Sequence, residues 1–427
     1  MSGYAIIDDW KPLNKQLGFV HTVYGQLKQH LKTNSNLIGD PAGESGVSFI
    51  LYPIALYISI LGKAGKYQRA FDVFHDLDTD GPLAPHPKIY SSLLSVFADR
   101  VDSADVDTDA IAKSVSEAKY IWRSHMRSLD KRPQQHVEPR SIEAMIKVLS
   151  RGEPPDHELM FDIVRDICGL SRPGEDLPSS PSQEKKVSPN TWILNEVLNG
   201  CITAGRPEMA VHYAQSVMNT RELHPIIGAW HLNKLVHAHI HLAKGGSKSP
   251  DRSGNVAAWV EWMLAQDPTR EPSKTTPNER TLVCALDLCS RCKDTHSALR
   301  IVRAVATTGM KGASSSPSLP IRAWEYLFQL ATAAGQDEKR QCLELLSIHS
   351  SVLDVWETTS VQRLPPPEKK AHELLAIHIV QVFKAVLPSS DHEGAGSPDA
   401  AELEVWSGIR RRAQSFLEKT HRHKRKS

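Results

Sequence analysis

The sequence predicts an all-α protein, an α-solenoid of stacked helix-turn-helix repeats. Three observations predict this fold class. Apolar residues recur at helical spacing along most of the chain, helical segments come in pairs joined by short turns, and the stripe that begins at Ile54 recurs 36 residues later at Tyr90. No β-rich segment and no Rossmann-like alternation of strands and helices interrupts this pattern.

One helix is predicted over residues 12–32, ahead of the repeats. The first hairpin follows, and its two apolar stripes are Ile54, Tyr57, Ile58 and Leu61, and then Ala70, Val73, Phe74 and Leu77. Gly65 lies between the stripes, which predicts that it ends the first helix. Ala70 is small enough to let the two helix backbones approach each other closely.

The spacing from the turn to the alanine recurs along the chain. Gly205 and Ala210 repeat it, and Ala298 keeps it with Lys293 in the place of the glycine. Gly335 again follows an apolar helix. Because one such hairpin cannot bury its own apolar face, successive hairpins are predicted to stack into an array.

Three segments are predicted from this pattern. They are an N-terminal helical segment at 1–45, a degenerate repeat array at 46–357, and C-terminal helices with a basic tail at 366–427. Within the last segment, residues 368–387 and 399–419 predict two helices.

Composition restricts the classes of function. The chain has 427 residues, of which 40% are hydrophobic and 23% charged, and its formal net charge is +2, so no overall charge drives it toward nucleic acid or membrane. Basic character is concentrated in residues 410–426. Six cysteines, most of them within helix-like patterns, favour buried free thiols over a disulfide framework. No apolar run approaches the ~18 residues that a membrane span needs, so no membrane insertion is predicted.

Two segments carry a resemblance to a known family. From Tyr52 to Pro85 the order is "LGKAG", then "RAFDVFHDL", then Gly81 and Pro85, and residues 276–311 follow the same order. The segments resemble the pentatricopeptide repeat family, in a degenerate, non-catalytic form of fungal or mitochondrial type. A tetratricopeptide repeat also fits "GKYQRAFDVF", but the spacing of 36 residues and the Gly…Pro exits favour the pentatricopeptide interpretation.

The resemblance implies a non-catalytic RNA-binding protein that supports mitochondrial RNA processing, stability or translation. The implied partners are single-stranded RNA or a ribonucleoprotein such as the mitochondrial ribosome, with protein partners on the solenoid surface, and no cofactor is implied. Mitochondrial localisation rests on the resemblance alone, because residues 1–30 resemble neither a secretory signal nor a transit peptide. The alternative is a tetratricopeptide-like scaffold that binds proteins and no RNA.

In this family the fifth residue of each repeat helps to read one RNA base. On that frame the fifth places hold Leu56, Ser92, Ala144, Glu196, Lys234, Cys284 and Tyr326. The family prefers Asn, Ser or Thr there, and only Ser92 complies, so contact with RNA through shape and charge is predicted instead of base-by-base reading. The predicted RNA-binding residues are Ser92, Lys234 and Tyr326, together with the basic run Arg410, Arg411, Arg412, Arg422, Lys424, Arg425 and Lys426.

A second candidate site has the spacing of a zinc ligand set. Cys284, Cys289, Cys292 and His296 follow one another at intervals that suggest zinc. The last three share one side only if the helix continues through Lys293, where the repeat frame places a turn. Packing of buried cysteines is therefore the favoured interpretation, zinc is the alternative, and no catalytic residue is predicted.

Four tryptophans could stack on RNA bases or pack in the core. Trp230, Trp259, Trp262 and Trp324 all occupy helix-stripe positions. Their periodicity favours the core.

Overall fold

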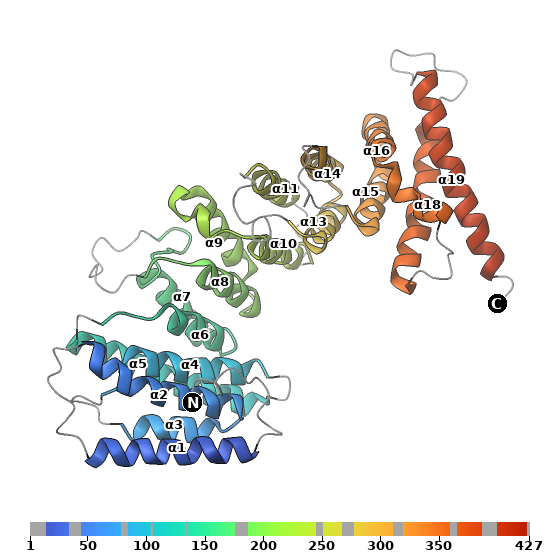
Figure 1. Cartoon of the computed structure of the whole chain (residues 1–427). Coiled ribbons are helices and arrows are strands. Elements are labelled where there is room, and N and C mark those ends of the chain that lie inside the picture. Colours follow the sequence, from blue (N-terminus) through green and yellow to red (C-terminus); the bar gives the residue numbers. More distant parts are fainter. Residues whose placement is uncertain are drawn as a thin grey trace. The chain divides into compact units, whose positions relative to one another are not determined.

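The computed structural model describes residues 14–33, 44–77, 84–103, 106–132, 135–175, 187–244, 251–266, 277–310, 319–358, 365–386 and 399–424. Over these residues the chain forms α-helices and short 3-10 turns and no β-strand (Figure 1). None of the helices described is both long and apolar enough to span a membrane. The predicted all-α class is confirmed.

The chain divides into two compact units, unit 1 (Met1–Ile226) and unit 2 (Ile227–Ser427). In unit 1, helix α1 (Asn14–Thr33) packs against the first of a series of helical hairpins. The first helices of these hairpins form one layer, each against the next: α2 (Glu44–Lys63), α4 (Pro87–Val101), α6 (Pro139–Leu149) and α8 (Thr191–Thr203). Each second helix packs on its own first helix: α3 (Tyr67–His75), α5 (Thr108–Lys131), α7 (Pro154–Asp166) and α9 (Pro207–Asn219), which the 3-10 turn η4 (Arg221–Ile226) follows.

Unit 2 repeats this arrangement. Its first helices, each packed against the next, are α10 (Ala229–Lys244), α13 (Glu279–Cys292), α15 (Ile321–Ala333) and α18 (Pro366–Val386). Its second helices form a second layer: α11 (Asp251–Leu264), α14 (Thr295–Met310), α16 (Gln336–Ile348) and α19 (Ala400–Lys424). The short η5 (Ser350–Leu353) and α17 (Val355–Thr358) precede α18. Stacked hairpins therefore build each unit, which confirms the predicted solenoid class.

The predicted turns are confirmed at three hairpins. Gly65 and Gly205 both have φ +70°, and Lys293, in the place of the glycine, has φ 56°. Each turn closes with a hydrogen bond across six residues, as from the Lys66 N–H to the Leu61 carbonyl at 2.8 Å. At Gly335 the structure differs, because α15 ends at Ala333 and Gly335 takes the extended N-cap conformation of α16.

The alanines after these turns are fully buried, as their spacing predicted. Ala70, Ala210 and Ala298 each have an exposed fraction of 0%. A larger side chain at any of the three would separate the two helices of its hairpin.

Lys293 should be a site of stored backbone strain. The left-handed backbone conformation is unfavourable by about 1–2 kcal/mol for a residue other than glycine, whereas glycine adopts it freely. Lys293→Gly is therefore expected to raise the free energy of unfolding by about 1 kcal/mol in chemical denaturation. Lys293→Ala is the control, since it removes the charge and keeps the strain; equal stability of the two variants would contradict the account.

Candidate nucleic-acid interface

Seven first helices carry an exposed residue four residues before the fifth places named above, and on α18 Lys370 takes the corresponding place in the same pattern of exposed and buried residues. In unit 1 these residues are Tyr52, Lys88, Arg140 and Trp192, and in unit 2 they are Trp230, Arg280, Arg322 and Lys370; we call each set of four the cation–aromatic row of its unit. All eight side chains are exposed, with Tyr52, Trp192 and Trp230 exposed by 46%, 58% and 37%. Every hairpin described thus presents a cation or an aromatic ring at the same place.

Helix stability does not explain the cations of the row. Lys88, Arg140, Arg280 and Arg322 are each the second residue of their helix, beside its positively polarised end. A cation there is unfavourable by typically about 0.3–1 kcal/mol, whereas an acid would be favourable. Helices α4, α6 and α15 nevertheless have no acid in their first turn. An anionic ligand would be attracted by both the side chains and the helix ends.

Neighbouring hairpins of unit 1 bring members of the row together. The Lys88 ammonium lies 5.5 Å from the centre of the Tyr52 ring, so adjacent first helices present a stacked cation and aromatic pair. The Arg140 guanidinium on α6 donates a hydrogen bond to the hydroxyl of Ser95 on α4 at 3.1 Å. The row members of α2 and α4 therefore lie side by side, and Arg140 contacts α4 two turns beyond Lys88.

Further cations lie along the same face. In unit 2, Lys234 lies one turn beyond Trp230, and Arg291, three turns beyond Arg280, forms an ion pair with Asp287 at 2.9 Å. Burial, followed by the charges of Lys234 and Arg280, lowers the pKa of His237 on this face. The charges of the neighbouring cations thus add to the effect of burial on this side chain.

In unit 1 part of the charge on this face is neutralised. Lys147 and Arg151, which lie two and three turns beyond Arg140, both contact Asp102, at 2.7 and 3.3 Å. The row residues themselves stand apart from this acid, so in unit 1 the attraction for an anion is concentrated on the row.

The predicted residues Ser92, Lys234 and Tyr326 lie half-buried on α4, α10 and α15. Each is one helical turn from a member of the row, so the structure places all three at one register position of the first helices. Burial, and then the charges of Asp287 and Glu325, raises the pKa of Tyr326, so its hydroxyl can donate a hydrogen bond at neutral pH.

Two arginines in the described part of the C-terminal basic run contact other side chains. The Arg410 guanidinium lies 5.1 Å from the centre of the Phe383 ring, and Arg412 forms ion pairs with Asp354 and Glu357, both at 2.7 Å. Arg411 and Arg422 are exposed on α19. Lys424 is the last residue of α19, its side chain lies outside the described part of the structure, and so do Arg425 and Lys426.

The cysteine and histidine residues do not come together around a metal. Helix α13 ends at Cys292, and the left-handed Lys293 turns the chain so that His296 begins the next helix. Cys289 is fully buried, and burial raises the pKa of the Cys284, Cys289 and Cys292 thiols, which disfavours the thiolate ligands that zinc needs. Among the described residues no group of three or more His, Cys, Asp or Glu side chains could hold a metal ion.

One of the four tryptophans does not follow the core prediction. Trp259 and Trp324 are buried, Trp262 is half-buried, and Trp230 is exposed. Trp230 belongs to the row, as does Trp192, which sequence reasoning missed. The signal that could have found both is the recurrence of an aromatic or basic residue four places before each fifth place.

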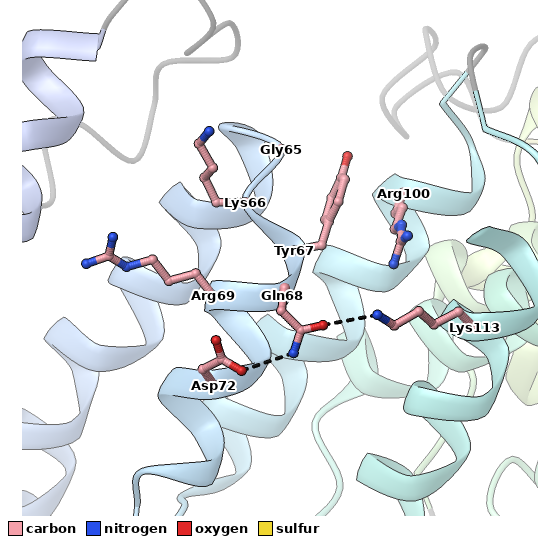
Figure 2. A pocket seen from close by; sticks show the side chains of 8 residues that line it. All are labelled: Gly65, Lys66, Tyr67, Gln68, Arg69, Asp72, Arg100 and Lys113. Carbon is pink, nitrogen blue, oxygen red and sulfur yellow. Dashed lines mark hydrogen bonds between the residues drawn. The ribbon is translucent and has the colours of Figure 1, made fainter. Parts of the chain in front are cut away.

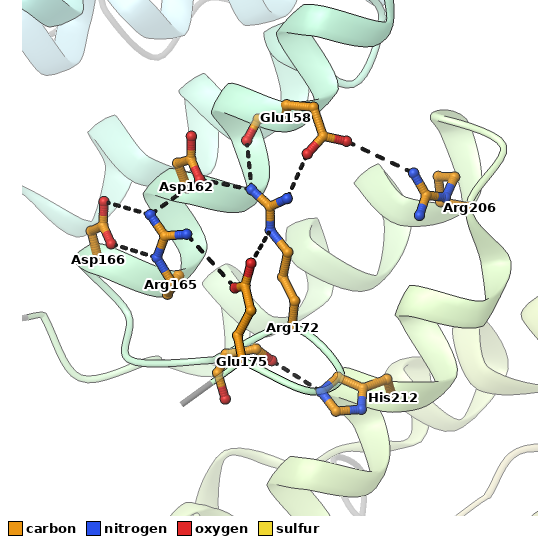
Figure 3. Close-up of polar contacts among 9 residues, drawn as sticks. Glu158, Asp162, Arg165, Asp166, Arg172, Glu175, Arg206 and His212 are labelled. Atoms are coloured by element: carbon orange, nitrogen blue, oxygen red, sulfur yellow. Dashed lines mark hydrogen bonds and ion pairs between the residues drawn. The ribbon is translucent and has the colours of Figure 1, made fainter. Parts of the chain in front are cut away.

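Figure 3 shows a different polar cluster, built on α7 in unit 1. The Arg172 guanidinium contacts Glu158 and Asp162, the latter at 2.7 Å, and lies 5.5 Å from the centre of the Phe161 ring. Arg165 contacts Asp162 at 3.1 Å. Because cations and acids pair within the cluster, it fixes the loop after α7 and leaves little net charge for a ligand.

No model of a known protein family and no curated protein sequence matches this chain. Among solved structures it is similar to the pentatricopeptide repeat protein PPR10 in complex with an 18-nucleotide psaJ RNA element, and to a cysteine-to-serine variant of that complex. In both comparisons the identity is 11%, the match covers 98% of this chain and 64% of the other, and the TM-score is 0.26. The chain therefore spans slightly less than two thirds of the length of PPR10, and a likeness at this TM-score carries no information on function.

Proposed function

We propose that the chain is a non-catalytic RNA-binding protein of pentatricopeptide-like type, in which the cation–aromatic row of each unit holds single-stranded RNA. The observation that carries the proposal is the recurrence of one exposed cation or aromatic ring in every described hairpin. Cations of this kind neutralise phosphates, and exposed rings stack on bases of any sequence. We further propose a role in mitochondrial RNA processing, stability or translation, in association with a ribonucleoprotein such as the ribosome.

The composition of the row favours RNA over a peptide ligand. A peptide-binding groove would need pockets for apolar side chains, whereas the row offers charge and flat rings. Since none of its members is Asn, Ser or Thr, it contains none of the side chains by which the family discriminates bases. Binding is accordingly expected to depend strongly on salt and weakly on sequence.

Removing the three cations of the row in unit 2 should reduce the salt dependence of RNA binding. For single strands, the slope of log K against log salt is about −0.7 for each phosphate neutralised. The variant Arg280→Ala/Arg322→Ala/Lys370→Ala is therefore expected to make the slope shallower by about 2. Fluorescence anisotropy with a labelled single-stranded RNA at several salt concentrations measures this slope.

The matched control removes three cations from second helices of the same unit: Arg303→Ala/Lys339→Ala/Arg340→Ala. This control should keep the slope of the unaltered protein. Equal slopes for both variants would contradict the assignment of the row. If the unaltered protein showed no salt-dependent binding of RNA at all, the tetratricopeptide-like scaffold would be the better description.

The organellar role needs a separate test in cells. Crosslinking followed by sequencing of the attached RNA should recover mitochondrial transcripts or mitochondrial ribosomal RNA. Recovery of nuclear-encoded messages alone would contradict the organellar role and leave RNA binding itself intact.

A further inference from the structure

A second cationic site lies in unit 1, at the turn between α2 and α3. It is a pocket of about 510 Å³, lined by Gly65, Lys66, Tyr67, Gln68, Arg69, Asp72, Arg100 and Lys113 (Figure 2). Along α2, Gly65 is thirteen residues from Tyr52, which corresponds to ~20 Å at 1.5 Å per residue. The pocket is therefore separate from the cation–aromatic row.

The lining of the pocket is predominantly cationic. Lys66 and Arg69 are exposed and have no acidic partner among the residues that the structure describes. Arg100 and Lys113 share the carboxylate of Glu117 on α5, at 4.0 and 3.7 Å. Four cations thus line the pocket together with Asp72 and near one shared carboxylate, the Lys66 and Arg69 side chains pointing away from Arg100 and Lys113 (Figure 2), and an excess of positive charge remains.

The Asp72 carboxylate already accepts a hydrogen bond within the pocket. One of its carboxylate oxygens accepts a hydrogen bond from the Gln68 amide at 3.0 Å, and the carbonyl oxygen of Gln68 accepts one from the Lys113 ammonium at 3.0 Å (Figure 2). The Gln68 bridge holds Asp72 and Lys113 on one side of the pocket, while Lys66 and Arg69 reach out from α3 on another.

The beginning of α3 adds unpaired donors to this charge. Lys66 is its N-cap and supplies no side-chain acceptor, and its first turn contains no acid. By contrast, Asp107 accepts from the Ala110 N–H at the start of α5, and Asp294 accepts from the Ser297 N–H at the start of α14. The first-turn amides of α3 are left for an external acceptor.

We propose that this pocket binds a terminal phosphate group. A phosphomonoester carries more charge than the phosphodiester of a strand interior, so a pocket lined by four cations favours it. The Tyr67 ring, with the Arg100 guanidinium carbon 5.0 Å from its centre, provides a flat wall for an attached base or sugar. The group could come from the 5′ end of an RNA or from a free mononucleotide; the row does not enter this argument.

The test compares two labelled RNAs of the same sequence, one with a 5′ phosphate and one with a 5′ hydroxyl, and competes each with AMP. The full chain should bind the 5′-phosphorylated RNA about tenfold more tightly, the value of one charge-assisted hydrogen bond. Lys66→Glu should abolish this preference, and Lys66→Arg should keep it.

The control is Lys384→Glu, which reverses an exposed lysine on α18 in unit 2 and should keep the preference. If the RNA ends are not distinguished but AMP binds the full chain and not Lys66→Glu, the pocket takes its phosphate from a free nucleotide. If neither the 5′ phosphate nor AMP shows a contribution that depends on Lys66, the proposal is overturned. RNA binding through the row would then remain, with equal affinity for both ends.

Discussion

Acidification from pH 7 to pH 4 is expected to destabilise the folded chain by about 3 kcal/mol for each of two buried histidines, His125 in unit 1 and His239 in unit 2. Their exposed fractions are 0% and 2%, and neither ring nitrogen of either side chain has a hydrogen-bond partner. Burial lowers the pKa of both from the ordinary 6.5 to about 4, with smaller contributions from His86 for His125 and from Arg252 for His239.

The direction follows from the proton balance. Between pH 6.5 and about pH 4 the unfolded chain binds protons at these two positions and the folded chain does not. The contribution to stability is therefore complete above pH 6.5, falls as the pH decreases through this window, and is lost below about pH 4. Urea unfolding at a series of pH values measures the slope.

The neutral His125 ring is held by aromatic packing. It stacks on the Tyr90 ring at 4.5 Å between centres with an angle of 12°, and Trp122 meets it edge-on at 6.1 Å. His125→Phe keeps a ring of similar size and removes one of the two titrations, so it should reduce the loss of stability on acidification by about 3 kcal/mol and change stability at pH 7 little. The control His241→Gln alters an exposed histidine on α10 and should keep the pH dependence. A pH slope unchanged by His125→Phe would contradict the assignment.

The turns were predictable from sequence because their cause is local. Gly65 and Gly205 occupy left-handed positions that few residues tolerate, and Lys293 could be recognised because Ala298 keeps the spacing of the hairpin. The helical stripes are likewise encoded within a few turns of chain. Hairpin order and fold class follow from these local signals.

The charges on the surface were less predictable because their partners are remote in sequence. The basic run 410–426 is continuous in the chain, but Asp354 and Glu357 neutralise Arg412, and the Arg410 guanidinium lies over the Phe383 ring. The row of each unit has the opposite character: its members are dozens of residues apart, and only the stacking of first helices within the unit aligns them. A search of the sequence for local charge density therefore selects the basic run and misses the row.

The close approach of α2 and α4 should make Gly62 intolerant of any side chain. A Cβ atom built on Gly62 would lie 3.1 Å from both Cβ and Cγ1 of Val96 and still closer to its Cγ2, and Val96 is 2% exposed. In a helix, Gly→Ala normally stabilises the protein by up to about 1 kcal/mol. Overpacking a core typically destabilises it by about 1–3 kcal/mol. Gly62→Ala is therefore expected to lower the free energy of unfolding by about 1 kcal/mol, and Gly62→Leu by about 3 kcal/mol or more.

Two further variants distinguish the effect of the Gly62–Val96 contact on stability from the effect of helix propensity. Gly18→Ala on α1, where an added Cβ meets nothing within 4 Å, should gain the normal helix increment. Val96→Ala should recover most of the stability lost in Gly62→Ala, since it removes the atoms that clash. If Gly62→Ala instead stabilised the chain as Gly18→Ala does, α2 and α4 would not be stacked at this register. The alignment of Tyr52 with Lys88, and with it the row in unit 1, would then fail as well, because both depend on the same contact between first helices.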